Sequence, residues 1–299
     1  MALIYRAHFA FIRNPRINSK GINTSAVFGF TNTLLDVMKS EKPTHIGIVY
    51  DTDKPTFRHT DFAAYKANRQ ERPEDITIAF PFIQKMAEGF GIPNLWLDGY
   101  EADDVIGTLA KKAAREGYSV YMLTPDKDFG QLVEENIYQY KPSALGKPRE
   151  ILGEKEICAR WEINTTAQVI DILGLMGDSI DNIPGVPGVG EKTAKKLIQE
   201  YGSVESVVEN AEKIKGKLGE SIRQFAQQAL LSKQLATICI DCPVDFDPAA
   251  LHLDEPDYPL LKDLFEELEF RAMATRVFSD KEARQALQKA EKSPPENTE

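Results

Sequence analysis

Apolar residues recur at helical spacing in several segments of the chain. Residues 25–41 carry their apolar side chains on one face, which predicts an amphipathic helix. Residues 77–90 predict a second helix, with Pro81 in its first turn or at a kink. Residues 102–117 predict a third, which Gly117 ends.

Short apolar runs alternate with these helices. Residues 44–51, 94–97 and 119–124 are bounded by polar residues and predict buried strands. Strands separated by helices indicate an α/β fold with a mostly parallel sheet and helices on both faces. In such sheets, functional sites form at the carboxyl ends of the strands, where Asp51 and Asp126 lie.

The remaining segments suggest how the chain is divided. Residues 53–72 are basic and aromatic with little apolar periodicity, so we expect an exposed, partly helical excursion from the α/β domain over 1–152. Residues 153–278 look mostly helical and predict a second, helical subdomain. Residues 279–299 are polar and indicate a linker or disordered tail.

Composition is that of a soluble protein, with 42% hydrophobic and 27% charged residues among 299. No apolar run reaches about 18 residues and no signal-peptide pattern opens the chain, so neither a membrane span nor secretion is expected. Three cysteines argue for a reducing compartment, and we expect a cytoplasmic protein. Cys239 and Cys242 form a C-x-x-C without a second pair, which favours buried side chains over a zinc or redox site.

Acidic residues gather in four clusters, each beside an apolar element. The clusters comprise Asp51; Glu101, Asp103 and Asp104; Asp126 and Asp128; and Asp178 and Asp181. Oxygen ligands without histidine or cysteine select Mg²⁺ or Mn²⁺, and two such ions about 3.5–4 Å apart catalyse phosphodiester cleavage. Any one cluster could equally be a helix cap, a turn or a solvated face.

Net charge at first argues against nucleic acid as a partner, because the formal value is −10. Setting the eight clustered acids aside as metal ligands takes it from −10 to −2, which no longer excludes DNA.

The segment over 181–203 combines glycines with lysines in an expected turn between two helices. Gly185, Gly188 and Gly190 allow the backbone to approach a phosphate closely, and a helix then begins with exposed N–H groups. The side chains expected to contact DNA there are Lys192, Thr193, Lys195 and Lys196. Such contacts to the DNA backbone are independent of sequence; the alternative is a purely structural turn.

Four segments together resemble motifs of the 5′ nuclease (flap endonuclease) family, and in particular the N-terminal nuclease domain of bacterial DNA polymerase I. They read VYD, GYEADDV, LTPDKD and MGDSIDNIPGVPGVGEKTA, and the resemblance runs from residue 1 to about 278. It implies a PIN-like core, a helical arch over about 53–76 and a helix–three-turn–helix at 181–203. It also implies removal of 5′ flaps and RNA primers with two divalent ions, and a K⁺ ion held by the hairpin.

The resemblance also implies roles for individual residues. All eight clustered acids match metal-site carboxylates, with Asp104 and Asp178 acting through water. Lys66 and Arg69 would face the scissile phosphate, where a cation stabilises developing charge. The remaining DNA contacts implied are Arg58 and Arg72 in the electropositive funnel, Tyr5 stacking on a base, and Arg6 holding a phosphate near the cut.

Family members open with a buried strand ending in Asp-Gly before the segment that matches MALIYRAHF. We therefore expect this strand and one metal-ligating Asp to be missing from the chain, with a polymerase region following in a longer protein. The expected function is that of a monomeric, Mg²⁺-dependent nuclease of flapped, nicked or primer-bearing DNA at the bacterial nucleoid. One alternative is a form that binds DNA without cutting it, and another is a PIN-like ribonuclease.

Overall fold

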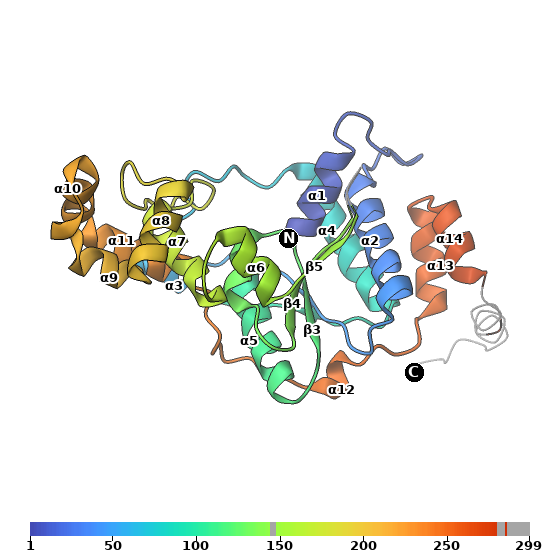
Figure 1. The fold of residues 1–299 in the computed structure, drawn as a ribbon. Helices are drawn as coiled ribbons and strands as arrows, with labels where there is room; N and C mark the ends of the chain where they lie inside the picture. The colour runs from blue at the N-terminus through green and yellow to red at the C-terminus, as the bar shows by residue number, and fades with distance from the viewer. Residues whose placement is uncertain (144–147, 280–284, 286–299) are drawn as a thin grey trace. The chain divides into compact units, whose positions relative to one another are not determined.

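The computed structural model describes residues 1–143, 148–279 and 285, which fold into two compact units (Figure 1). Unit 1 comprises residues Met1–Tyr50, Arg72–Leu95 and Asp247–Glu299, and unit 2 comprises Asp51–Glu71 and Trp96–Phe246. Each unit has its own hydrophobic core. The predicted boundary at residue 152 lies inside unit 2 and stays a prediction about subdomains.

Unit 1 is mainly helical. Its helices are α1 (Ala2–Ala10), α2 (Ser25–Glu41), α4 (Glu74–Gly89), α12 (Pro248–Leu251), α13 (Tyr258–Glu267) and α14 (Arg271–Phe278). The apolar face of α2 packs Phe30 and Leu34 into a core with Ile83 of α4 and Phe265 of α13. Pro81 is accommodated within the N-terminal half of α4.

Two short strands complete unit 1. β1 (Ile48–Val49) and β2 (Asn94–Leu95) run parallel, with Ile48 opposite Asn94 and Val49 opposite Leu95. The apolar runs over 44–51 and 94–97 predicted longer strands. Strand pairing extends only where two backbones run side by side, and in the described part of the chain each of these strands pairs with the other alone.

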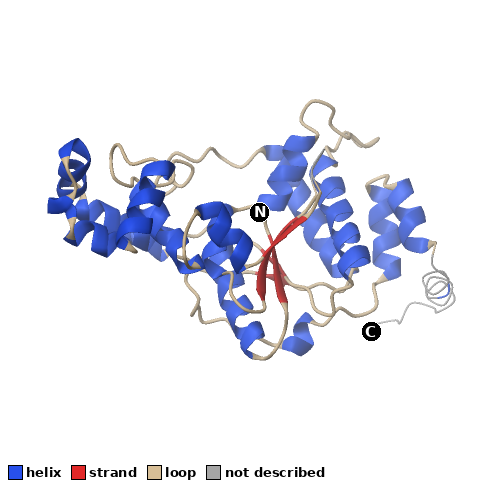
Figure 2. Cartoon of the chain, viewed as in Figure 1, coloured by secondary structure: helices blue, strands red, loops and turns tan. Residues whose placement is uncertain are grey.

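Unit 2 contains a three-stranded sheet of order β3–β4–β5 (Figure 2). β3 (Val120–Leu123) is parallel to β4 (Ile137–Lys141), which is antiparallel to β5 (Glu150–Leu152). Helix α5 (Ala102–Arg115) packs on β3 and β4, and α6 (Glu154–Trp161) packs on β5. Two of the acidic segments, at the start of α5 and after β3, therefore belong to this small α/β layer.

Most of the rest of unit 2 is helical. The elements are α3 (Phe57–Asp61), α7 (Val169–Met176), α8 (Glu191–Tyr201), α9 (Val204–Glu209), α10 (Gly216–Gln224) and α11 (Ala226–Ala236), with short 3₁₀ turns η1 (Lys127–Leu132), η2 (Thr166–Gln168) and η3 (Ala211–Lys213). Ile172, Ile198 and Leu235 join Phe129 of η1 in one core. In unit 2, α7 and η2 thus pack directly on the turn that follows β3, and α8 and α11 contribute to the same core.

The expected α/β class with a parallel strand pair and many helices is confirmed. None of the helices described is long and apolar enough to cross a membrane. The predicted tail over 279–299 lies outside the described residues except for positions 279 and 285.

Candidate active site

All eight predicted carboxylates belong to unit 2, on four separate segments. Asp51 follows β1 in the chain, and its Oδ1 accepts a hydrogen bond of 3.0 Å from the backbone N–H of Ala102, the first residue of α5. Asp103 lies in that same first turn. Burial, together with the negative charges of Asp126 and Asp51, raises the pKa of Asp103 well above its usual range. Three of the four clusters therefore act on one another electrostatically.

The turn after β3 holds the next pair of carboxylates. Asp126 caps η1, accepting a hydrogen bond of 3.0 Å from the backbone N–H of Asp128. Gln139 on β4 is buried and donates its side-chain N–H to the backbone carbonyl of Asp126. Burial and the charge of Asp126 raise the pKa of Asp128 to about 8. The Oδ1 of Asp128 is buried and has no hydrogen-bond partner among the described residues.

Three cations lie between the acidic clusters. Lys66 Nζ is 2.6 Å from Glu101 Oε1 and 3.6 Å from Asp181 Oδ2. Arg69 contacts Asp181 at 2.5 Å. Lys127 forms an ion pair of 2.7 Å with Asp178 Oδ2. The segment after α3 and the turn after β3 therefore both present positive charge to the acids.

The backbone at Lys66 is unusual. Its φ of 54° is left-handed, a conformation that non-glycine residues rarely adopt. The N–H of Lys66 donates to the carbonyl of Asp181 over 3.0 Å. Beside it, the buried Tyr65 donates its hydroxyl to Glu101 Oε2 over 3.1 Å. The chain is thus held so that Lys66 faces Glu101 and Asp181.

Several of these residues were missed by the motif analysis. Tyr65, Gln139 and Lys127 contact or support the predicted acids. Lys127 and Tyr65 each lie next to a predicted residue, so their sequence position was the available signal. Gln139 lies on a strand that the sequence analysis did not predict, 13 residues from the carbonyl it supports.

The donor set fits a hard divalent cation. It offers carboxylate oxygens, the ligands that Mg²⁺ and Mn²⁺ prefer. Crowded acids with raised pKa values and the unpartnered Oδ1 of Asp128 both favour a bound cation. Within the described residues no three acidic, histidine or cysteine side chains already surround one ion position. Binding an ion would therefore draw carboxylates away from Lys66, Arg69 and Lys127.

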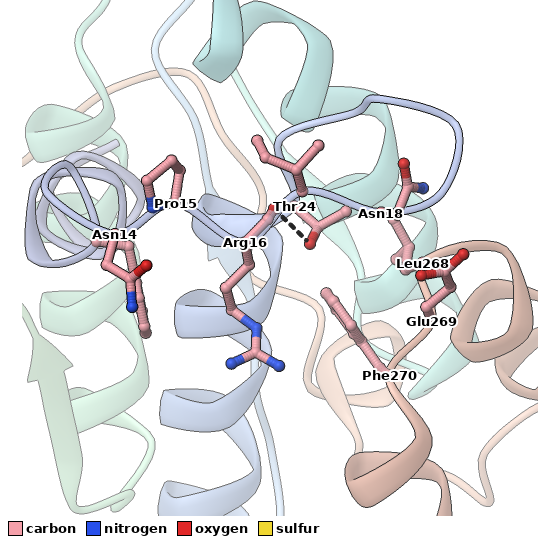
Figure 3. A pocket seen from close by; sticks show the side chains of 10 residues that line it. Asn14, Pro15, Arg16, Asn18, Thr24, Leu268, Glu269 and Phe270 are labelled. Atoms are coloured by element: carbon pink, nitrogen blue, oxygen red, sulfur yellow. Dashed lines mark hydrogen bonds between the residues drawn. The ribbon is translucent and has the colours of Figure 1, made fainter.

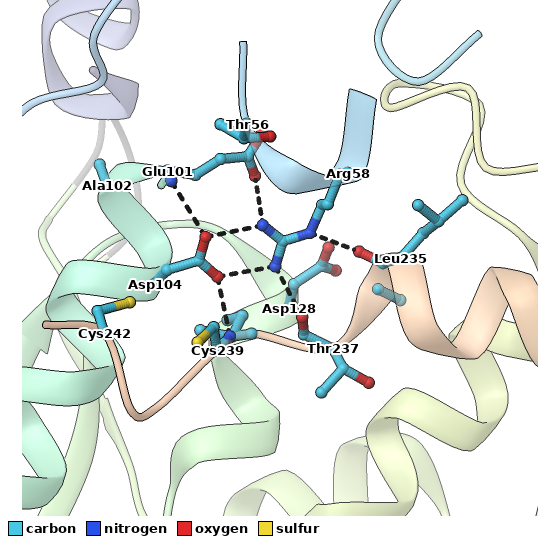
Figure 4. A network of polar contacts seen from close by, with 12 residues as sticks. Thr56, Arg58, Glu101, Ala102, Asp104, Asp128, Leu235, Thr237, Cys239 and Cys242 are labelled. Carbon is cyan, nitrogen blue, oxygen red and sulfur yellow. Dashed lines mark hydrogen bonds and ion pairs between the residues drawn. The ribbon is translucent and has the colours of Figure 1, made fainter. Parts of the chain in front are cut away.

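Asp104 and Arg58 differ from the other predicted residues because both are buried, at 0% and 2% exposure. The Arg58 guanidinium donates two hydrogen bonds of 2.7 Å to the two carboxylate oxygens of Asp104 (Figure 4). Burial alone would lower the pKa of Arg58, but the hydrogen bond to Asp104 raises it above its usual value. The structure does not present Arg58 to DNA, nor Asp104 to a metal ion.

The glycines of the hairpin separate into two environments. Gly185 is buried, and its N–H donates to Ser232 Oγ over 3.0 Å. A Cβ on Gly185 would come within 2.4 Å of the backbone nitrogen of Gly177. Gly188 and Gly190 are exposed, and a Cβ on either would meet nothing within 4 Å. Only these two leave room for a phosphate.

The lysines of α8 also differ in their exposure to solvent. Lys192 and Lys196 are exposed, and Thr193 is partly exposed. Lys195 is buried and forms ion pairs with Glu191 at 2.8 Å and Glu162 at 3.3 Å. Gly190 immediately precedes the helix, so its first N–H groups open beside Lys192. The structure thus leaves five of the seven predicted hairpin residues fully or partly exposed, whereas Lys195 and Gly185 are buried.

Three predicted residues belong to unit 1, whereas all eight carboxylates belong to unit 2. Tyr5 and Arg6 are partly buried on α1, where Tyr5 lies 6.3 Å from Phe9 between ring centroids. The guanidinium of Arg72 lies over the ring of Phe80 at 5.6 Å.

A pocket of about 370 Å³ lies in unit 1, between the loop that follows α1 and the turn between α13 and α14 (Figure 3). Thr24 Oγ1 donates to the carbonyl of Arg16 at its rim, and Glu269 accepts a hydrogen bond from the backbone of Ser19. None of the predicted acids lines it.

Two family models together match most of the chain. They are the 5′-3′ exonuclease N-terminal resolvase-like domain over residues 1–162 and the 5′-3′ exonuclease C-terminal SAM fold over residues 164–259. DNA polymerase I of Bacillus subtilis is 38% identical over 286 residues, covering 93% of this chain and 32% of the relative. DNA polymerase I of Geobacillus stearothermophilus is 41% identical over 289 residues, covering 92% and 31%. The chain spans about a third of the length of these curated relatives.

Solved structures of similar fold include the T5 5′-exonuclease with bound zinc. It has a TM-score of 0.67 at 19% identity, over 89% of this chain and 95% of that one. The catalytic core of Rad2 in complex with DNA substrate has a TM-score of 0.59 at 16% identity, over 89% and 85%. At these identities the likeness concerns the fold.

Proposed function

Because this chain belongs to the 5′-3′ exonuclease family, we propose that it hydrolyses phosphodiester bonds of DNA at 5′ flaps, nicks and primer ends. The observation that carries the proposal is the gathering of carboxylates from four segments of unit 2 around Lys66, Arg69 and Lys127.

Two divalent ions, Mg²⁺ or Mn²⁺, are proposed to act at this site. Bound there, they would supply a water of lowered pKa and positive charge for the transition state. The residues proposed to hold them are Asp51, Glu101, Asp103, Asp126, Asp128, Asp178 and Asp181. Asp104 is left out of this set because both of its oxygens are occupied by Arg58.

Lys66 and Arg69 are proposed to hold the scissile phosphate. Their present partners are carboxylates, Glu101 and Asp181. A phosphate offers the same kind of anionic oxygens, and Arg69 can bind it with two parallel hydrogen bonds. Positive charge fixed beside the reacting phosphorus stabilises the charge that develops in the transition state.

The hairpin between α7 and α8 is proposed to bind the DNA backbone away from the cut. Gly188, Gly190, Lys192, Thr193 and Lys196 are the residues accessible for that contact. Binding through phosphates alone would be independent of sequence and would weaken with salt. A K⁺ ion held by backbone carbonyls of the hairpin is proposed as part of the same contact.

The relatives suggest a setting for this activity. They are DNA polymerases of about three times the length matched here, so a polymerase region in the same protein is proposed. We propose that the nuclease acts as a monomer on chromosomal DNA during replication and repair, in the bacterial cytoplasm.

The test is cleavage of a 5′-labelled flap duplex in Mg²⁺ by the intact chain and by Asp126→Asn. The variant should cut at least about 100-fold more slowly, since changing a residue that merely hydrogen-bonds to a metal ligand already costs 10–100-fold. Asp245→Asn, which changes an exposed aspartate of unit 2, should cut like the unaltered chain. Equal products from all three proteins would reject the assigned site.

A DNA-binding role without cleavage is the second candidate. It is favoured by the absence, within the described residues, of any three side chains already arranged around one ion. Flap binding that persists with no product at any Mg²⁺ or Mn²⁺ concentration would establish it in place of the nuclease.

A further inference from the structure

The buried Arg58–Asp104 pair joins three segments of unit 2. Arg58 lies on α3, Asp104 on the first turn of α5, and the carbonyls of Leu235 and Thr237 at the end of α11 and just after it. Arg58 Nε donates to Leu235 over 2.9 Å and Nη2 donates to Thr237 over 2.7 Å. The guanidinium therefore uses its remaining donors to bind the C-terminal end of α11.

Asp104 makes the complementary contacts. Its Oδ2 accepts the backbone N–H of Glu101 over 3.0 Å, and its Oδ1 accepts the backbone N–H of Cys239 over 2.8 Å (Figure 4). Each carboxylate oxygen thus receives two hydrogen bonds, one from Arg58 and one from the backbone. A buried ion pair is tolerated when its geometry is good and its remaining hydrogen-bonding groups are satisfied, as here.

The pair also reaches the side chain of Glu101. Arg58 Nη1 lies 3.6 Å from Glu101 Oε2, which in turn accepts the hydroxyl of Tyr65. Glu101 is therefore fixed at its backbone by Asp104 and at its carboxylate by Arg58 and Tyr65. The other oxygen, Oε1, faces Lys66 at 2.6 Å.

We propose that Arg58 and Asp104 are positioning residues, which hold Glu101 in the orientation that a divalent ion requires and tie it to the end of α11. The proposal rests on the proposed function. It replaces the roles that charge and motif position indicated, a DNA contact for Arg58 and a water-mediated metal contact for Asp104. Their burial and mutual hydrogen bonds leave neither group accessible for those roles.

Arg58→Lys keeps the charge but loses the planar fork that binds both oxygens of Asp104. In the DNA-free chain, the Kd for Mn²⁺ measured by calorimetry should rise about 10- to 100-fold, the usual effect of changing a residue behind a metal ligand. Arg115→Lys, at the exposed end of α5, should leave it unchanged. In a Glu101→Gln background, Arg58→Lys should add little, because it acts through that carboxylate.

Hydrogen exchange gives a readout that needs no metal. In Arg58→Lys, peptides spanning 100–105 and 237–242 should exchange faster, since the Glu101 and Cys239 amides are both bound by Asp104. Peptides of α8 should exchange as before. If Arg58→Lys does not fold, Asp104→Asn, which keeps the shape and removes the charge, is measured in its place.

The outcomes separate the possibilities. Unchanged Mn²⁺ affinity and exchange with a loss of flap-DNA affinity alone would make Arg58 a DNA contact and overturn the proposal. A lower melting temperature as the sole change would make the pair merely structural and also overturn it. An unaltered chain that binds no Mn²⁺ would reject the metal site of the proposed function, and the exchange experiment would still decide about the pair.

Discussion

Adjacent residues of the same type have different surroundings and partners in this molecule. Asp103 and Asp104 are adjacent, yet successive helical residues point roughly 100° apart, so Asp103 faces Asp51 and Asp126 whereas Asp104 is buried against Arg58. In the same way, Lys195 is buried whereas Lys196 is exposed. The sequence located these groups but could not tell their directions, because the partner that decides each one is distant in the chain.

Tyr65 offers a test at the level of a single hydroxyl group. Burial and the charge of Glu101 raise its pKa, so the hydroxyl stays protonated and donates to that carboxylate. A hydrogen bond to a charged group contributes about 1.5–3 kcal/mol. Tyr65→Phe should therefore lower the melting temperature by roughly 5 °C in a calorimetric scan.

Tyr121→Phe is the matched control, because the hydroxyl removed there belongs to a half-exposed ring stacked on Tyr138. It should melt like the unaltered chain. An equal drop in both variants, or none in Tyr65→Phe, would show that the hydroxyl does not support Glu101.

At the level of elements, periodicity predicted helices better than strands. The structure confirms the range 25–41 for α2, because its single apolar face decides both its structure and its burial. The sequence did not predict β4 because Gln139, a polar residue at 1% exposure, interrupts its apolar pattern. The buried side chain of Gln139 donates to the carbonyl of Asp126. A contact that supports the site therefore replaces the apolar residue by which the strand would have been predicted. Strand lengths depend on pairing partners, which no local pattern contains.

Alanine substitutions at two hairpin glycines should lower the stability of the protein to very different degrees. Gly185→Ala forces a Cβ against the backbone of Gly177 at a φ of 61°, and should cost about 3 kcal/mol or more in the free energy of unfolding. Gly190→Ala meets open space and should cost at most about 1 kcal/mol as a changed helix cap. Urea denaturation followed by tryptophan fluorescence measures both.

The DNA affinity of the two glycine variants, measured by fluorescence anisotropy with a flap duplex, should not follow the order of their stabilities. Gly190→Ala should bind DNA more weakly while remaining folded, since its methyl group occupies the space left for a phosphate. Full DNA affinity in Gly190→Ala would remove the exposed glycines from the proposed interface.

At the level of the whole molecule, all seven proposed metal ligands fall in one unit, as do the two tryptophans, Trp96 and Trp161. Tryptophan fluorescence therefore follows the unfolding of unit 2. Mn²⁺ at 100 times its Kd should raise the stability seen by this probe by about 2.7 kcal/mol, and EDTA should reverse the rise. The same rise in Asp128→Asn would place the bound ion elsewhere.

The interleaved path of the chain has a consequence for synthesis on the ribosome. Unit 2 has all of its residues once Phe246 has emerged. Unit 1 includes segments made before unit 2, yet its core requires Leu261 and Phe265 of α13, which are made after Phe246. Helices α1, α2 and α4 can pack on one another earlier, but the apolar surface that α13 covers stays exposed until unit 2 has been made. Nascent chains halted before α13 are the ones for which a chaperone would be most needed.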